Sequence, residues 1–87
     1  MRYTIEIARP AQKQLNKLDP SVRKKIGRRI DGLAEDPRPS GVAKLTDVSP
    51  SLYRVREGQY RVLYTINDDK LIVLVIRIGH RSEVYKY

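Results

Sequence analysis

Apolar and polar residues alternate at the start of the chain. Tyr3, Ile5 and Ile7 are separated by polar neighbours, which is the period-2 pattern of a strand with one buried face. Successive side chains of a strand point to opposite faces, so only one face of this segment needs a covering layer. Residues 2–7 are therefore predicted to form a half-buried strand.

Two segments with helical spacing follow this strand. The first begins near Pro10, which suits a first helical turn. Its apolar stripe consists of Ala11, Leu15 and Leu18. In the second segment Asp19 is placed as the N-cap and Pro20 as the first helical residue. Its stripe consists of Val22, Ile26, Ile30 and Leu33. Because the connection is very short, the two helices are predicted to form a hairpin.

The second half of the chain has the pattern of a sheet. "VAKLTDV" (42–48) predicts a short strand, and "YRVREGQYRVLY" (53–64) predicts a hairpin with Gly58 first in a two-residue turn, as a type II′ turn prefers. Residues that pair across a hairpin point to the same face. One face then carries Tyr53, Val55, Val62, Tyr64 and Ile66, directed at the helices. The opposite face carries Arg54, Arg56 and Arg61.

The last apolar run, "LIVLVIRIG" (71–79), is apolar on both faces for most of its length, which is typical of an interior strand. Gly79 allows a bend that would bring His80, Arg81 and Tyr85 near the arginine hairpin. The pattern leaves open whether Arg77 joins the same face. The fold class is therefore predicted to be α+β, one domain over 1–87, with a two-helix hairpin packed on one face of a mostly antiparallel sheet.

Charge and composition narrow the function. Eighteen Lys and Arg against ten Asp and Glu give a net charge of +8, which favours a polyanionic partner such as nucleic acid. A soluble basic surface or an acidic protein partner are the alternatives. With no cysteine and one histidine, disulfides and ordinary metal sites lack their residues, so no cofactor is expected. The longest apolar run, Leu71 to Ile76, is shorter than the ~20 residues that span a bilayer, which predicts a cytoplasmic protein.

The arginine hairpin has a further consequence. Its register places Arg56 opposite Arg61, and like charges in that position cost stability. An anion bound over them would explain the arrangement. The alternatives are that Glu57, Asp68 or Glu83 neutralises the arginines, or that the turn differs by one residue.

RNA cleavage by the substrate's own 2′-hydroxyl fits such a site. The reaction needs a base, an acid for the leaving 5′-oxygen and positive charge on the transition state, but no metal. Arg54, Arg56 and Arg61 are the candidates for binding the phosphate. Neighbouring cations would favour the phenolate of Tyr85 as the base, with His80 or Arg81 facing the leaving group. The plainer alternatives are that His80 is a surface or packing residue and that Tyr85 covers the sheet edge.

The strand, the two helices and above all "YRVREGQYRVLY" and "GHRSEVY" resemble the RelE/ParE toxin superfamily, in particular its RelE branch. The resemblance implies a ribosome-dependent mRNA interferase that cuts mRNA in the ribosomal A site, with a RelB-like acidic antitoxin as partner. It assigns catalytic roles to Arg54, Arg56, Arg61, Arg81 and Tyr85, to which the proton-transfer argument adds His80. The RNA-binding set is Arg54, Arg56, Arg61, Arg77 and Arg81.

This sequence departs from some relatives of that superfamily in two ways. Arginine stands where they have lysine at the positions of Arg54 and Arg56, and a guanidinium does not deprotonate in proteins, so proton transfer moves toward Tyr85 and His80. The segment from Gly79 to Tyr85 is also short, which loosens the match of Arg81. A gyrase poison of the ParE type and a basic RNA-binding module without activity are the alternative functions.

Overall fold

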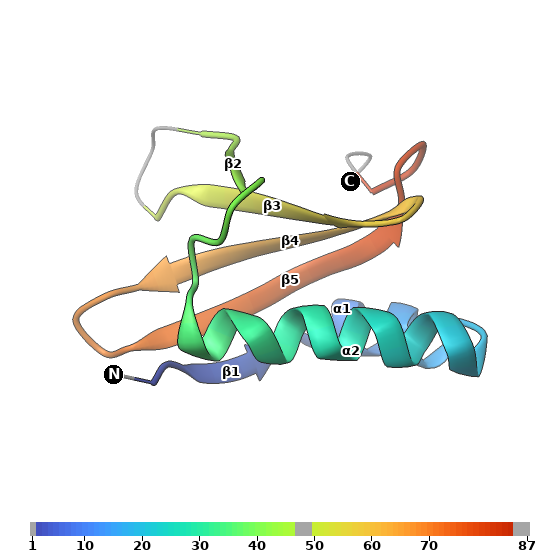
Figure 1. Cartoon of the computed structure of the whole chain (residues 1–87), viewed down its shortest axis with the longest axis horizontal. Helices are drawn as coiled ribbons and strands as arrows, with labels where there is room; N and C mark the ends of the chain where they lie inside the picture. Colours follow the sequence, from blue (N-terminus) through green and yellow to red (C-terminus); the bar gives the residue numbers. More distant parts are fainter. Residues whose placement is uncertain (1, 47–49, 85–87) are drawn as a thin grey trace.

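The computed structural model describes residues 2–46 and 50–84. Its elements, in chain order, are β1 (Thr4–Ile7), α1 (Arg9–Asn16), α2 (Pro20–Glu35), β2 (Ala43–Lys44), β3 (Leu52–Glu57), β4 (Tyr60–Asn67) and β5 (Ile72–His80). The strands form a five-stranded sheet in the order β1-β5-β4-β3-β2 (Figure 1). Only the β1–β5 pair is parallel among these pairings. The predicted α+β class and the mostly antiparallel sheet are confirmed.

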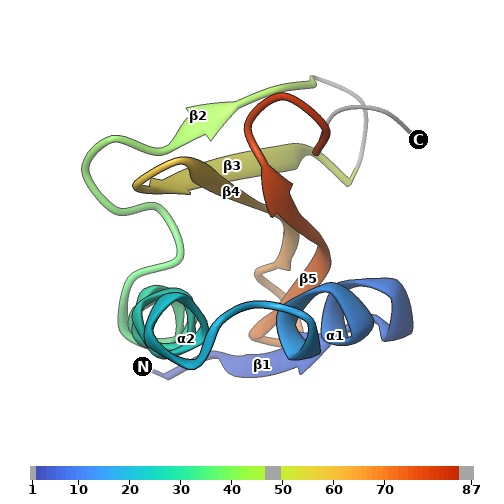
Figure 2. The same cartoon turned by 90° about the vertical axis from the view of Figure 1, so that its right-hand side faces the viewer.

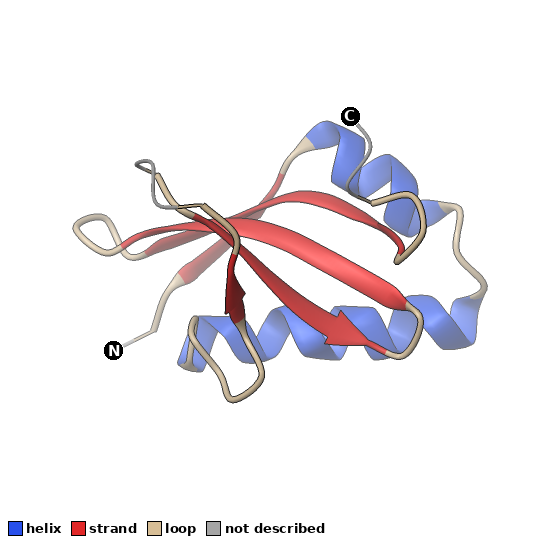
Figure 3. Ribbon diagram, turned by 90° about the horizontal axis from the view of Figure 1, so that it is seen from above, coloured by secondary structure: helices blue, strands red, loops and turns tan. Residues whose placement is uncertain are grey.

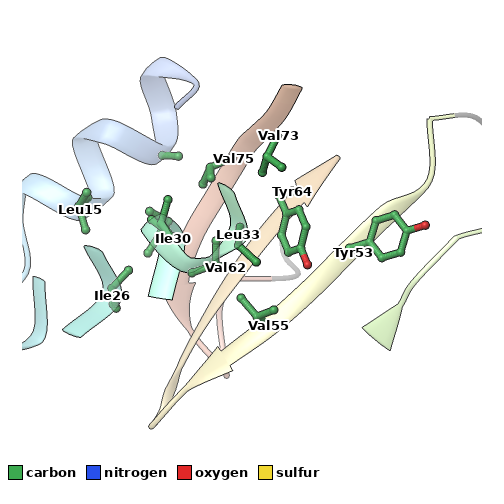
Figure 4. Packing of buried hydrophobic residues seen from close by; sticks show 12 residues of the cluster. Leu15, Ile26, Ile30, Leu33, Tyr53, Val55, Val62, Tyr64, Val73 and Val75 are labelled. Carbon is green, nitrogen blue, oxygen red and sulfur yellow. The ribbon is translucent and has the colours of Figure 1, made fainter. Parts of the chain in front are cut away.

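Both helices lie on one side of the sheet, and the end-on view shows β3 and β4 rising away from the helix layer (Figure 2). The stripe predicted for α2 is the buried one, with Ile26, Ile30 and Leu33 at most 2% exposed. These side chains meet the inner face of the sheet, which is the face that carries Val62 and Tyr64 (Figure 4). Burial of this apolar surface is the main contribution to the fold's stability.

The β3–β4 hairpin has the predicted register. Tyr53 pairs with Tyr64 and Arg56 pairs with Arg61. Gly58, the first residue of the turn, has a φ of +59°, a conformation that glycine adopts without steric cost. The alternative of a turn shifted by one residue is therefore wrong, and the arginines and the apolar residues lie on opposite faces.

A β-bulge in β5 decides the position of Arg77. Leu63 pairs with Arg77 but the next residue of β4, Tyr64, pairs with Val75, so Ile76 has no partner in β4. An extra residue reverses the alternation of a strand. Val73 and Val75 therefore point toward the helices before the bulge, while Arg77 beyond it points to the opposite face.

The C-terminal half of β5 extends past the end of β1, and α1 lies beside it (Figure 3). There the side chain of Gln14 replaces a neighbouring strand, because its Oε1 accepts the backbone N–H of Ile78 at 2.9 Å. This bond satisfies a polar group that the sheet leaves without a strand partner. Gln14 thereby holds the part of β5 that leads to Gly79 and His80.

Replacing Gln14 by alanine is expected to leave the Ile78 N–H without its acceptor, at a cost of about 1–3 kcal/mol. Amide hydrogen exchange should show faster exchange at Ile78, whereas the amides of β3 should keep their rates. Gln12→Ala is the matched control, since Gln12 is exposed on the same helix and bonds Asn16. Equal exchange at Ile78 in the two variants would contradict this role of Gln14.

Candidate functional site

The face of the sheet away from the helices carries two rows of arginines. In one row, running across β3, β4 and β5, Arg56 pairs with Arg61 and Arg61 with Gly79. In the adjacent row Leu63 lies between Arg54 and Arg77. These four residues, Arg54, Arg56, Arg61 and Arg77, form the arginine face. The sheet register brings them together, including Arg77, whose place the sequence left open.

Arg61 is the most buried of the four, at 9% exposure. Its Nη1 donates to the backbone oxygens of Gly58 at 3.0 Å and Tyr60 at 2.9 Å. The guanidinium therefore ties together the two ends of the hairpin turn. These carbonyl dipoles also offset part of the repulsion from Arg56, which lies directly opposite.

Arg54 and Arg56 differ in their surroundings. Arg56 is exposed, whereas Arg54 is half-buried. The Nε of Arg54 is buried and has no hydrogen-bond acceptor in the part of the chain that the structure describes. The Nε of Arg29, on α2, is buried without an acceptor as well, so this feature is not peculiar to the arginine face.

The carboxylates considered as neutralising partners lie elsewhere or make other contacts. Asp68 forms an ion pair with Arg38 at 2.9 Å, at the opposite end of β4 from the hairpin turn. Within residues 2–46 and 50–84, the structure contains no ion pair from Glu57 or Glu83 to Arg54 or Arg56. Two arginines of this face are thus not neutralised by the carboxylates that the sequence suggested.

Arg81 lies beside the hairpin turn, because its backbone N–H donates to Gln59 O at 2.8 Å. The chain bends after His80, whose carbonyl accepts the N–H groups of Glu83 and Val84, both at 2.9 Å. The bend was predicted at Gly79, which instead belongs to β5. The absence of a side chain at Gly79 serves another purpose, since Val84 packs over it with its Cβ 3.5 Å from where a Cβ of residue 79 would stand.

His80 is not brought to the arginine face. It pairs with Tyr60, and alternation places both on the face that carries Val62. Its Nδ1 lies 2.8 Å from Ser82 Oγ and accepts the Ser82 N–H at 3.2 Å, while its ring meets the Tyr60 ring edge-on at 5.9 Å. These contacts hold the bend between β5 and Val84. Tyr85, the predicted base, lies outside the described residues.

A second polar cluster lies at the other end of the sheet and was not anticipated from the sequence. Arg38 donates to both oxygens of Asp68, at 3.2 and 2.9 Å, and its Nε donates to Tyr53 Oη at 3.3 Å. Tyr3 Oη donates to the same carboxylate at 2.6 Å. The hydrogen bonds from Arg38 and then Tyr3 lower the pKa of Asp68 from 3.8 to about 2. This cluster joins the segment after α2 to the β4–β5 turn.

The lowered pKa of Asp68 should make its contribution to stability depend on pH, and comparison of the wild type with Asp68→Asn tests this. A carboxylate whose pKa is lowered in the folded state stabilises the protein above its unfolded pKa, and that contribution is lost as the pH falls through the folded value. We expect the wild type to exceed Asp68→Asn in unfolding free energy above about pH 5, with the difference shrinking toward pH 2. Denaturant unfolding at each pH measures it. A difference that stays constant with pH would rule out this dependence.

The described residues offer neither a metal-binding cluster nor a membrane-spanning helix. Over residues 2–46 and 50–84, no three side chains of histidine, cysteine, aspartate or glutamate gather in a group that could hold a metal ion. Neither α1 nor α2 is long and apolar enough to cross a membrane.

Comparison with known proteins places these features in a family. Residues 5–85 match the family described as "ParE toxin of type II toxin-antitoxin system, parDE". The mRNA interferase toxin RelE of Escherichia coli is 34% identical over 89 residues, covering 98% of this chain and 92% of that protein. Toxin RelG of Mycobacterium tuberculosis is 29% identical over 87 residues, covering 99% of each chain.

Solved structures agree with this match. The archaeal RelE–RelB complex from Pyrococcus horikoshii contains a chain that superimposes with a TM-score of 0.84 at 27% identity, covering 97% of this chain and all of that one. The intact RelBE toxin–antitoxin complex of E. coli gives a TM-score of 0.75 at 28% identity, covering 90% of this chain and 95% of that one. The predicted fold resemblance is confirmed over nearly the whole length.

Proposed function

Because this chain belongs to the ParE and RelE family of toxins from type II toxin–antitoxin systems, we propose that it is a ribosome-dependent mRNA interferase. It is an endoribonuclease of the cytoplasm that cuts mRNA in the ribosomal A site and thereby inhibits translation. The proposal extends to this chain the activity named for the E. coli relative at 34% identity.

The single observation that carries the proposal is the pairing of Arg56 with Arg61 on a face without helices. Two like charges in direct opposition lower stability, so their presence is explained best by an anionic ligand. A phosphodiester supplies both the negative charge and the acceptor oxygens that forked guanidinium groups bind.

The arginines have different proposed roles because their surroundings differ. Arg54 and Arg56 bind the phosphate, and Arg61, fixed by the turn carbonyls, presents a positioned positive charge to the phosphorane-like transition state. Arg77 and Arg81 extend the contact along the RNA. Arginines remain protonated throughout, so none of them moves the proton.

Proton transfer belongs to the groups that titrate. Tyr85 is the proposed base that takes the proton of the 2′-hydroxyl, since a phenol, unlike a guanidinium, can lose its own proton. His80 is the weaker of the two candidates, because its Nδ1 is engaged with Ser82 and it faces away from the arginines. Because this placement turns the ring away from the bound phosphate, His80 is assigned no step in the cleavage.

The partner that restrains the toxin is proposed to be an acidic, RelB-like antitoxin. The RelE chains of P. horikoshii and E. coli were solved in complexes with RelB. A net charge of +8 on this chain favours an acidic segment that covers the arginine face and so blocks RNA.

The test is single-turnover cleavage of an mRNA in programmed ribosomes by the wild type, Arg56→Ala and Tyr85→Phe. We expect cleavage by the wild type and a loss of about 100-fold or more in each variant. The family description carries the ParE name, so a DNA supercoiling assay with gyrase runs beside it. Inhibition of gyrase without RNA cleavage would replace the proposal with the gyrase function.

A further inference from the structure

A pocket of about 410 Å³ lies at the edge of the arginine face, between α1 and the bend after β5. It is lined by Gln14, Arg77, Gly79, Glu83 and Val84. These residues come from three separate segments, and the hydrogen bond from Ile78 to Gln14 and those from Glu83 and Val84 to His80 hold the segments in place. The pocket is therefore a built feature of the fold.

The position of the pocket relates it to the phosphate site. One of its lining residues is Gly79, the register partner of Arg61, and neighbouring strands lie about 4.8 Å apart. The pocket therefore adjoins the face on which the phosphate is proposed to bind. A base next to that phosphate is the part of an RNA chain that could enter.

The chemistry of the lining matches one base in particular. Glu83 supplies two acceptor oxygens side by side, and guanine is the only one of the four RNA bases whose Watson–Crick edge offers two neighbouring donors, N1–H and N2–H. The guanidinium of Arg77 suits the O6 and N7 acceptors of guanine. Gln14 adds a donor, because its Oε1 is used by Ile78 and its NH₂ group remains.

We propose that this pocket binds a guanine base of the RNA next to the phosphate held on the arginine face, with Glu83 as the residue that selects it. The proposal rests on the proposed function for its link to cleavage, but the binding of the base is a property of the protein alone. Glu83 acts as a specificity residue and takes no part in the bond-breaking step.

Titration of the ¹⁵N-labelled protein with 5′-GMP, 5′-AMP, 5′-CMP and 5′-UMP, followed by NMR, tests the pocket directly. GMP should shift the amides of Gly79 and Val84 and the side-chain amide of Gln14, while the other three nucleotides act mainly at the arginine face. Glu83→Gln should weaken GMP binding about 10-fold, to the level of AMP. Asp69→Asn, an exposed carboxylate in the β4–β5 turn, is the matched control and should bind GMP as the wild type does.

Equal shifts by GMP and AMP in the wild type, or an unchanged GMP preference in Glu83→Gln, would overturn the proposal. Sequencing of the cut sites on programmed ribosomes gives the second readout, in which Glu83→Gln should lose a bias toward guanine while still cutting. Guanine selectivity in NMR without RNA cleavage would retain the pocket and remove the proposed function. Cleavage without guanine selectivity in NMR would overturn the guanine pocket and retain the proposed function.

Discussion

Replacing Arg61 by alanine is expected to lower RNA cleavage on ribosomes by about 100-fold or more, because it removes a positioned charge from the transition state. The substitution also removes the two hydrogen bonds to Gly58 O and Tyr60 O, which should lower the unfolding free energy by about 1–3 kcal/mol. Arg61→Lys keeps the charge but cannot hold both carbonyls in the same geometry. It should therefore retain more activity than alanine while losing a similar amount of stability.

Single-turnover cleavage and denaturant unfolding of the same preparations separate the two effects. Lys24→Ala is the control. Lys24 is exposed on α2, so its replacement removes one positive charge from the helix layer and leaves the arginine face unchanged. Its cleavage rate should stay within about 2-fold of the wild type. A loss in Lys24→Ala equal to that in Arg61→Ala would mean that net charge, and not the arginine face, determines activity.

Ile30→Ala is expected to have the largest effect on stability. Ile30 is 2% exposed and packs from α2 onto the inner face of the sheet (Figure 4). Truncating such a side chain costs about 2–5 kcal/mol, from lost burial and from the cavity left behind. For a domain of this size the melting temperature should fall by about 10 °C or more.

Calorimetry or thermal unfolding followed by circular dichroism measures this effect. Val22→Ala is the matched comparison, because Val22 belongs to the same apolar stripe of α2 but is only half-buried. It should lower the melting temperature by clearly less. Equal losses in the two variants would show that burial along this stripe does not determine the stability of the helix layer.

The hairpin was predictable because its pattern and its turn agree. Period-2 alternation on both sides of Gly58 allows one register that places every apolar residue on one face, and the structure has that register. The helix stripes were predictable for the same reason, as Ile26 and Ile30 recur at helical spacing on one face of α2. Local patterns of this strength leave few alternatives.

The positions of Arg77 and His80 depend on a feature that the pattern does not reveal. Ile76 lies within a run of apolar residues, so nothing in "LIVLVIRIG" marks it as the unpaired residue of a bulge. That one residue sends Arg77 to the arginine face and His80 to the other. Sequence reasoning expected His80 beside the arginines, and the reversed alternation explains why it is not there.

Contacts between segments that are distant in the sequence could not be predicted either. Arg38 and Asp68 are 30 residues apart, and Gln14 and Ile78 are 64 apart. Neither pair has a local pattern, since a polar residue on a helix or in a turn is usually exposed to solvent. The pocket beside Gly79 depends on the second of these contacts, so it too became visible only in the folded chain.

The most direct test of the central claim is primer extension on one mRNA, held in programmed ribosomes or free in solution, with and without this protein. We expect cuts confined to the codon in the A site, present only with ribosomes and absent with Arg61→Ala and Tyr85→Phe. Uncut mRNA in both samples, from a protein that still arrests growth, would contradict the claim. The arginine face would then be a binding surface without nuclease activity.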